Sequence, residues 1–213
     1  MPHLVADCNQ PFNPKGGGYY GISLKSGLIT GVAAGSDLLQ LRFHSVQGNN
    51  ILKRFELKFL KIDFICTTGF TGAQAVDFGV FVARAFSANG TGGNASQVPS
   101  AMQKHKTQYP NSEMVANGDL RIANTAALGV GTKTLDTYPF ASVAGWGAAA
   151  TAGKVLSAPF QEEFGEHHVP IVLQDNEGLV IQNITAFGAA GVGNLYVDIE
   201  WMEVIDDVLG TIW

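Results

Sequence analysis

Charged side chains are scarce in this chain of 213 residues. Asp, Glu, Lys and Arg together make up 15% of it, whereas soluble domains average about 25%. A soluble monomer stays dispersed with charge on roughly 25–35% of its surface positions. We therefore expect this chain to cover part of its surface with other subunits, and a monomer rich in small residues is the alternative.

Basic residues are in the minority. Thirteen Lys and Arg stand against 18 Asp and Glu, which gives a net charge of −5. Proteins that bind nucleic acids take much of their affinity from phosphate contacts and usually carry a basic patch. The densest basic stretch, LKRFELKFLK at residues 52–61, mixes its charges with apolar residues as the solvent face of a strand does. Nucleic acid is therefore not an expected partner.

Long apolar runs and an export signal are also missing. No run approaches the ~18 apolar residues of a membrane span. The first residues, MPHLVADCNQPFNPKGGGYYG, lack the basic and apolar regions of a secretion signal. We expect synthesis in a cytoplasm and no membrane partner. The two cysteines, Cys8 and Cys66, do not make a disulfide framework, and Cys66 follows an apolar run that is typical of a buried position.

The densest group of chemically active side chains is EEFGEHHVP at residues 162–170. A metal site of the cupin type takes two nearby histidines from one strand. His167 and His168 are adjacent, and adjacent residues of a strand point to opposite faces. Both therefore cannot enter one site on a regular strand. We interpret the stretch as the polar end of a strand and expect neither a metal nor another cofactor.

Other catalytic arrangements find equally little support. Asp198 and Glu200 share one strand face about 7 Å apart, which is within the range that glycoside hydrolysis uses, but they alternate with apolar residues as in an ordinary half-buried strand. The chain has no G-x-S-x-G motif and no complete phosphate-binding loop. We therefore expect no enzymatic activity. The aromatic residues fit either core and interface packing or a sugar-binding face.

Alternation of apolar and polar residues predicts strands along most of the chain. The clearest strands are expected in residues 38–46, 54–68, 75–87, 168–174, 178–187 and 193–204, with shorter ones between 119 and 160. We expect the last two to form a hairpin, and one or two helical turns to begin at Pro99. Without any βαβ alternation, the pattern predicts an all-β antiparallel sandwich or barrel.

One predicted strand, at residues 54–68, changes its parity. Its apolar residues occupy odd positions as far as Phe59 and even positions from Leu60 to Phe64. A β-bulge inserts one residue and turns the strand, so that the same face stays buried. We therefore predict a bulge or a corner at Phe59–Leu60.

The chain is expected to form one domain, residues 21–213, with a loop-rich excursion at about 88–118. An extended N-terminal arm, residues 1–20, precedes it because prolines and three successive glycines prevent regular structure there. The arm still carries apolar side chains, which a free tail would rarely keep. We predict assembly contacts at four residues, each of which has the alternative of folding back on its own core: Phe12, Tyr19, Tyr20 and Trp213.

Three stretches carry a resemblance to known proteins: LRIANTAALGVGTKTLDTYPFASVAGW, IVLQDNEGLVIQN and GAAGVGNLYVDIEWMEV. They resemble a recurrent family of β-rich virion structural proteins from tailed bacteriophages. The resemblance covers about residues 119–204, with a weaker similarity at 53–87. It consists of strands and turns without a catalytic motif, so no functional residue is carried over.

The resemblance implies a jelly-roll-like β-sandwich that is made in the host cytoplasm and located in the virion. Its first implied role is capsid decoration or cement, as a symmetric homo-oligomer, often a trimer, bound to the major capsid protein or to other virion proteins. One alternative is a neck, tail or fibre component. Another is a host-glycan or receptor-binding module, for which we expect an exposed aromatic face on the loops at 88–118.

Overall fold

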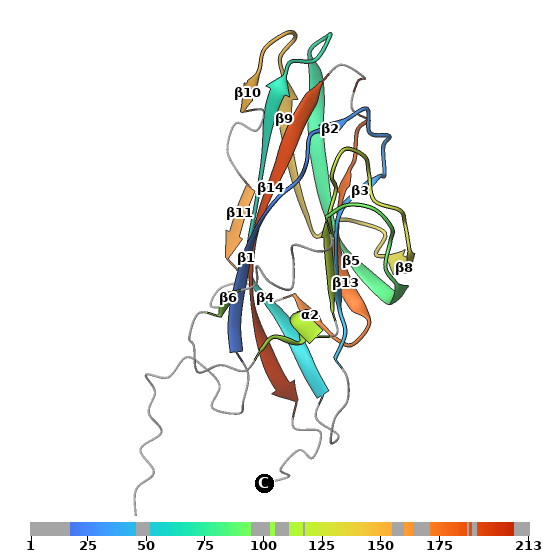
Figure 1. Ribbon diagram of the computed structural model, residues 1–213, viewed down its shortest axis with the longest axis vertical. Helices are drawn as coiled ribbons and strands as arrows, with labels where there is room; N and C mark the ends of the chain where they lie inside the picture. Colours follow the sequence, from blue (N-terminus) through green and yellow to red (C-terminus); the bar gives the residue numbers. More distant parts are fainter. Residues whose placement is uncertain are drawn as a thin grey trace, which may run out of the picture.

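The computed structural model shows an elongated sandwich of two β-sheets (Figure 1). It describes residues 18–45, 52–94, 103–104, 111–116, 118–154, 160–163, 171–186, 188 and 191–206. All pairings between the named strands are antiparallel. The prediction of an all-β antiparallel sandwich is therefore confirmed.

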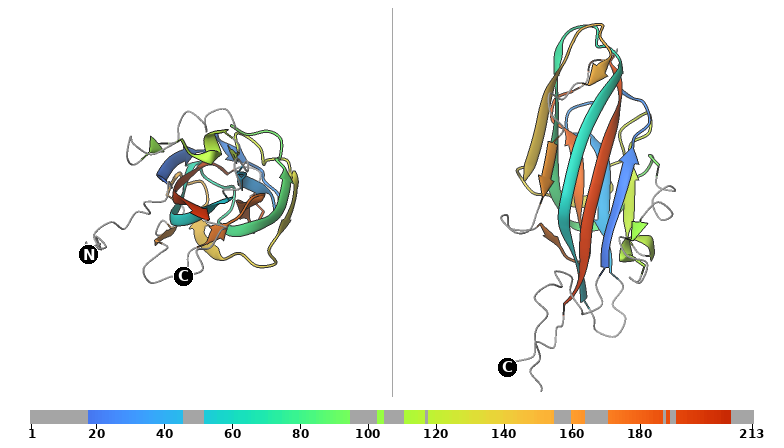
Figure 2. Two further views of the ribbon diagram at one scale, coloured as in Figure 1. Left: turned by 90° about the horizontal axis from the view of Figure 1, so that it is seen from below. Right: turned by 90° about the vertical axis from the view of Figure 1, so that its left-hand side faces the viewer.

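Sheet A, the first of the two sheets, is built around β14 (Val192–Asp206), which lies between β4 (Leu52–Thr68) and β1 (Gly18–Lys25). Figure 2 shows these three long strands side by side. Shorter strands extend the sheet: β10 (Gly153–Lys154), β11 (Phe160–Glu163) and β12 (Val172–Leu173) pair with β4, β2 (Ile29–Thr30) pairs with β14, and β6 (Gln103–Lys104) pairs with β1.

Sheet B, the second sheet, has the strand order β7 (Asp119–Ile122), β3 (Asp37–Phe43), β13 (Glu177–Asn183) and β5 (Gln74–Ala88). On its far side β5 pairs with two strands in succession, β8 (Thr132–Leu135) and β9 (Ala141–Gly147). One short helix, α2 (Glu113–Ala116), precedes β7. No helix in the described part of the chain has the length and apolar character needed to cross a membrane.

The strand order is that of a jelly roll, as predicted. Its principal strands in chain order are β1, β3, β4, β5, β9, β11, β13 and β14. The first pairs with the last, the second with the seventh, the third with the sixth and the fourth with the fifth. Pairing of β14 with β4 and of β13 with β5 joins these pairs into two layers, as in the double Greek key of jelly rolls.

One local prediction is wrong. β13 and β14 do not form a hairpin, because β13 belongs to sheet B and β14 to sheet A. Both strands nevertheless turn their apolar faces into the same core. The helical turns expected to begin at Pro99 stay a prediction, because most of that segment lies outside the described residues. Its described part is β6, which pairs with β1.

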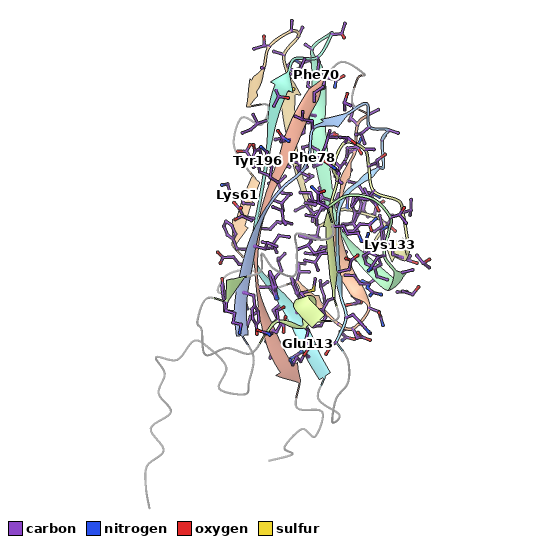
Figure 3. All side chains as sticks on the ribbon, in the orientation of Figure 1. Lys61, Phe70, Phe78, Glu113, Lys133 and Tyr196 are labelled. Atoms are coloured by element: carbon purple, nitrogen blue, oxygen red, sulfur yellow. The ribbon has the colours of Figure 1, made fainter. Side chains whose placement is uncertain are left out.

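The core between the sheets is filled with large side chains. Near the end of β14, the rings of Trp201 and Phe55 are stacked with centroids 5.4 Å apart, and the ring of Tyr20 lies 5.7 Å from that of Trp201. Further along the sandwich, the rings of Phe64 and Phe78 lie 5.5 Å apart, and Phe78 is labelled in Figure 3. Burying one large apolar side chain stabilises a fold by roughly 1.5–3 kcal/mol, so these rings hold the two sheets together.

The predicted bulge in β4 is confirmed, one residue earlier than expected. Glu200 of β14 lies opposite Phe59, but the next residue, Trp201, lies opposite Leu57, so Lys58 is the inserted residue. Leu57 and Leu60 both point into the core, and Phe59 is half-buried instead of joining them. The inserted residue therefore changes the parity of the strand and keeps its apolar face inside.

Both terminal strands meet at one end of the sandwich. β1 begins with Gly18, which lies opposite Glu203 near the end of β14. The start of β1 and the end of β14 are both at the lower end of the sandwich in Figure 1. Tyr19 and Tyr20 belong to β1 and not to an extended arm, which was predicted for residues 1–20. Residues 1–17 lie outside the described part. The opposite end consists of the β4–β5 and β9–β10 turns, whose exposed residues are Thr, Gly and Ala.

Candidate functional site

The stretch with two adjacent histidines is only partly described. Glu162 and Glu163 end β11, where they lie opposite Leu60 and Phe59 of β4. Glu162 and Glu163 are therefore the last residues of a strand, while the rest of the stretch, residues 164–170, lies outside the described part. His167 and His168 lie outside the described residues, so their predicted roles stay predictions.

His44 is the one histidine in the described part of the chain, and its partner is a carboxylate. Its Nδ1 lies 2.7 Å from Oδ1 of Asp175, which also accepts a hydrogen bond of 2.9 Å from the backbone N–H of Ser45. This contact ties the end of β3 to the β12–β13 turn. Within the described ranges, no three metal-ligating side chains of His, Cys, Asp or Glu come together.

The two carboxylates considered for glycoside hydrolysis lie on the outer face of sheet A. A carboxylate oxygen of Asp198 lies 3.5 Å from Nζ of Lys61. Glu200 accepts a hydrogen bond of 2.7 Å from the hydroxyl of Tyr19. Lys61 is seen on this side of the sandwich in Figure 3. Both carboxylates thus cross-link neighbouring strands, which is an ordinary stabilising role for pairs across a sheet.

The four predicted assembly residues fall into different places. Tyr20 is only 1% exposed and lies in the core, so the alternative that it packs on its own domain is the one observed, and its ring offers no surface to another subunit. Tyr19 is half-buried on the outer face of sheet A and remains a prediction. Phe12 and Trp213 lie outside the described residues.

A buried carboxylate, that of Glu203, fastens the segment around α2 to sheet A. It accepts hydrogen bonds from the hydroxyl of Ser112 at 2.5 Å, from the backbone N–H of Glu113 at 3.1 Å and from Nε1 of Trp201 at 3.2 Å. Burial raises the pKa of Glu203, and these hydrogen bonds and the nearby Lys53 oppose the rise.

Sequence reasoning did not single out Glu203, although a signal was present. Along β14 the inward positions are Leu195, Val197, Ile199 and Trp201, and Glu203 is the next residue of the same parity. A carboxylate at an inward position requires donors, because an unpaired buried charge is costly. Two of these donors, Ser112 and Glu113, come from a segment about 90 residues earlier, and no local pattern indicates that segment.

A second buried polar group lies on the outer side of sheet B. Asp37 accepts hydrogen bonds from Nζ of Lys133 at 2.6 Å, from Nε2 of Gln40 at 2.5 Å and from Nε2 of Gln182 at 2.7 Å. Gln40 also binds the loop above it, because its Nε2 donates to the carbonyl oxygen of Gly129 at 2.8 Å. Lys133 is therefore part of a structural ion pair in the folded chain, and it is labelled in Figure 3.

Aromatic side chains are exposed on the side of sheet B that carries β9. Trp146 of β9 is 64% exposed, and Tyr138, in the loop that leads into β9, is 81% exposed. The outward residues next to Trp146 on the same strand are Ser142 and Ala144, and both are exposed. These aromatics come from residues 136–147, and not from the loops at 88–118 where an aromatic face was expected.

No protein-family model matches this chain, and no curated protein sequence matches it. The fold and the surfaces described above are therefore the basis for a functional assignment.

Proposed function

We propose that this protein is a non-enzymatic structural component of a tailed-phage virion, most directly a capsid decoration or cement protein that assembles on the particle as a homo-oligomer. The observation that carries the proposal is a jelly-roll topology with a filled core. Jelly rolls serve as capsid subunits, lectins and cupins, so the fold narrows the choice to a few classes without deciding among them.

The filled core favours the structural class over a cupin-like enzyme. A cupin binds its metal and substrate inside the barrel, where histidines line an open cavity. Here the space between the sheets is occupied by aromatic rings, which include the fully buried Phe55, Phe64, Phe78 and Trp201. The described core residues include no histidine.

The position of the chain ends favours attachment through one end of the sandwich. Because Gly18 lies opposite Glu203, the segments before β1 and after β14 leave at the same end. These segments hold two of the predicted assembly residues, Phe12 and Trp213. We propose that this end attaches to the particle and that the uncharged turns at the other end project outward.

The mechanism of such a protein is stabilisation by buried area. A specific interface of ordinary size buries about 1,200–2,000 Å² in total. Many copies bound to one particle gain further strength, because each linked contact raises the effective concentration of the next. A chain with little charge loses little hydration free energy when such surfaces are covered.

The most direct experiment is quantitative mass spectrometry of purified particles of the phage that encodes this chain. We expect its peptides in a fixed ratio to those of the major capsid protein, unchanged after extensive density-gradient purification. Absence from purified particles would contradict the proposal. Immunogold labelling of the same particles then separates a capsid location from a neck, tail or fibre location.

A glycan-binding module is the second candidate, because of the exposed rings of Trp146 and Tyr138. Aromatic faces of this kind stack on sugars in many β-sandwich modules. A glycan array with the wild-type protein and the Trp146→Ala variant tests this function. Binding that depends on Trp146, by a protein absent from purified particles, would place the glycan function first.

A further inference from the structure

β9 is an edge strand without the usual protection of an edge. Along its seven residues, Ala141–Gly147, it pairs only with β5 among the described strands. Alternate residues of such a strand direct their N–H and C=O groups away from the sheet. Natural proteins protect exposed edges with charged residues, proline, bulges or very short strands. The sequence of β9, ASVAGWG, contains no charge and no proline.

The described part of the chain also has three edge strands of only four residues each. β7 carries Asp119 and Arg121, β11 carries Glu162 and Glu163, and the charged residue of β8, Lys133, is buried against Asp37. Among the described edge strands of four or more residues, β9 is therefore the one without a charged residue. An uncharged edge with an exposed tryptophan, Trp146, is expected to be covered by another strand.

We propose that β9 pairs antiparallel with β9 of a second copy of this chain, so that two B sheets continue into one another across a two-fold axis. This inference rests on the homo-oligomer of the proposed function and assigns its interface. A two-fold axis suits the strand because the same surface is used by both copies and the contact closes.

The side chains of β9 are compatible with their own copy. Residues directly opposite each other in an antiparallel pair lie on the same face of the sheet. With the axis near Ala144, Trp146 of each copy lies opposite Ser142 of the other, a large ring against a small side chain. Two β9 strands also bring no like charges together, which matters because each copy has a net charge of −5.

The strand pair needs support from the surface beside it. A strand of seven residues is about 23 Å long, whereas a stable interface buries about 1,200–2,000 Å². The exposed side chains of Trp146 and Tyr138 adjoin this edge and supply further apolar area. Trp and Tyr are enriched at the centres of protein interfaces, because they contribute a large contact area at a low cost in conformational entropy.

The test is the mass of the full-length protein in solution, by light scattering and sedimentation, for the wild type, Ala144→Lys and Ser23→Lys. Ala144 and Ser23 are both exposed on outer sheet faces, so the two variants add the same charge at similar positions. We expect a wild-type dimer or even-numbered oligomer, a twofold lower mass for Ala144→Lys and no change for Ser23→Lys. Circular dichroism of each variant checks that it is folded.

A second measurement does not depend on a substitution. The protein is diluted from a concentration at which the dimer forms to one at which it dissociates. The amides of β9 are then expected to lose protection from hydrogen exchange, and the fluorescence of Trp146 is expected to shift to longer wavelength. A wild-type trimer would overturn the two-fold pairing. An oligomer that Ala144→Lys leaves intact would overturn the β9 interface and leave the virion role standing. A wild-type monomer at all concentrations would overturn the β9 pairing and the homo-oligomer, while particle mass spectrometry still decides the virion role.

Discussion

Lys133 and Asp37 are 96 residues apart in the sequence, yet Nζ of Lys133 lies 2.6 Å from Oδ2 of Asp37. Each side chain is only 1% exposed. The pair joins the β8 region to the start of β3 on the outer side of sheet B. There Gln40 and Gln182 donate further hydrogen bonds to the carboxylate of Asp37. Its energetic role follows from its burial, because removal of one partner leaves a charge without compensation.

We predict that Lys133→Met lowers the free energy of unfolding by about 3–5 kcal/mol, the usual cost of leaving one member of a buried ion pair alone. Lys61→Met is the matched control. Lys61 and Asp198 lie 3.5 Å apart with side chains 36% and 37% exposed, and loss of such a surface pair costs about 0–1 kcal/mol. Urea denaturation of both variants measures the difference, and equal losses would contradict a special role for Lys133.

We predict a pH-dependent effect for Glu203→Gln. The folded-state pKa of Glu203 is raised by burial, so the folded chain holds this proton more tightly than the unfolded chain does. The contribution of Glu203 to stability is then largest below the unfolded-state pKa and falls as the pH rises through the folded-state pKa. Glutamine does not titrate.

The stability of Glu203→Gln relative to wild type should therefore increase as the pH rises through that window and become constant above it. Urea denaturation at a series of pH values measures this difference, in which the titration of all other groups cancels. Glu113→Gln serves as the control on the neighbouring carboxylate. A difference between Glu203→Gln and wild type that does not change with pH would show that burial does not perturb Glu203.

We predict that Gly178→Ala severely destabilises the protein. A Cβ atom at Gly178 of β13 would lie 2.0 Å from the backbone oxygen of Leu41 in β3, so the two strands would have to separate. Gly72, in the β4–β5 turn, has no atom within 4 Å of such a Cβ, and Gly72→Ala should change the stability by less than about 1 kcal/mol. Thermal unfolding compares the two, and similar melting temperatures would contradict the close approach of β13 and β3.

We predict opposite fluorescence changes for two tryptophans. Trp201 is fully buried and Trp146 is 64% exposed. In dilute protein, Trp146→Phe should remove emission that is red-shifted and readily quenched by acrylamide, whereas Trp201→Phe should remove blue-shifted, protected emission. Emission spectra and quenching constants give the measurement. Equal quenching in both variants would contradict the positions of the two rings.

The strands and one irregularity were predictable because they depend on residues close in the sequence. Alternation along β14 predicts which residues point inward, and Leu195, Val197, Ile199 and Trp201 are all in the core. The change of parity near Phe59 predicts the bulge, since only an inserted residue keeps both halves of β4 facing inward.

The partners of the strands were not predictable in the same way. β13 and β14 follow each other in the sequence with glycine-rich residues between them. The same pattern is typical of a hairpin, yet the two strands lie in different sheets. Tyr20 belongs to an arm-like sequence and is nevertheless in the core. In both cases the outcome depends on which distant surface covers the apolar side chain, and a local pattern contains no information about that surface.

By itself, therefore, the sequence determined that this chain forms many short and long strands with one apolar face each, and that it has little charge to keep copies apart. Only the tertiary structure decided that β1 closes on β14, that Asp37 and Lys133 form a buried pair, and that β9 is left as an uncharged edge. The physical reason is that periodicity acts between residues two positions apart, whereas strand pairing acts across as many as 185 residues, the separation of Gly18 and Glu203.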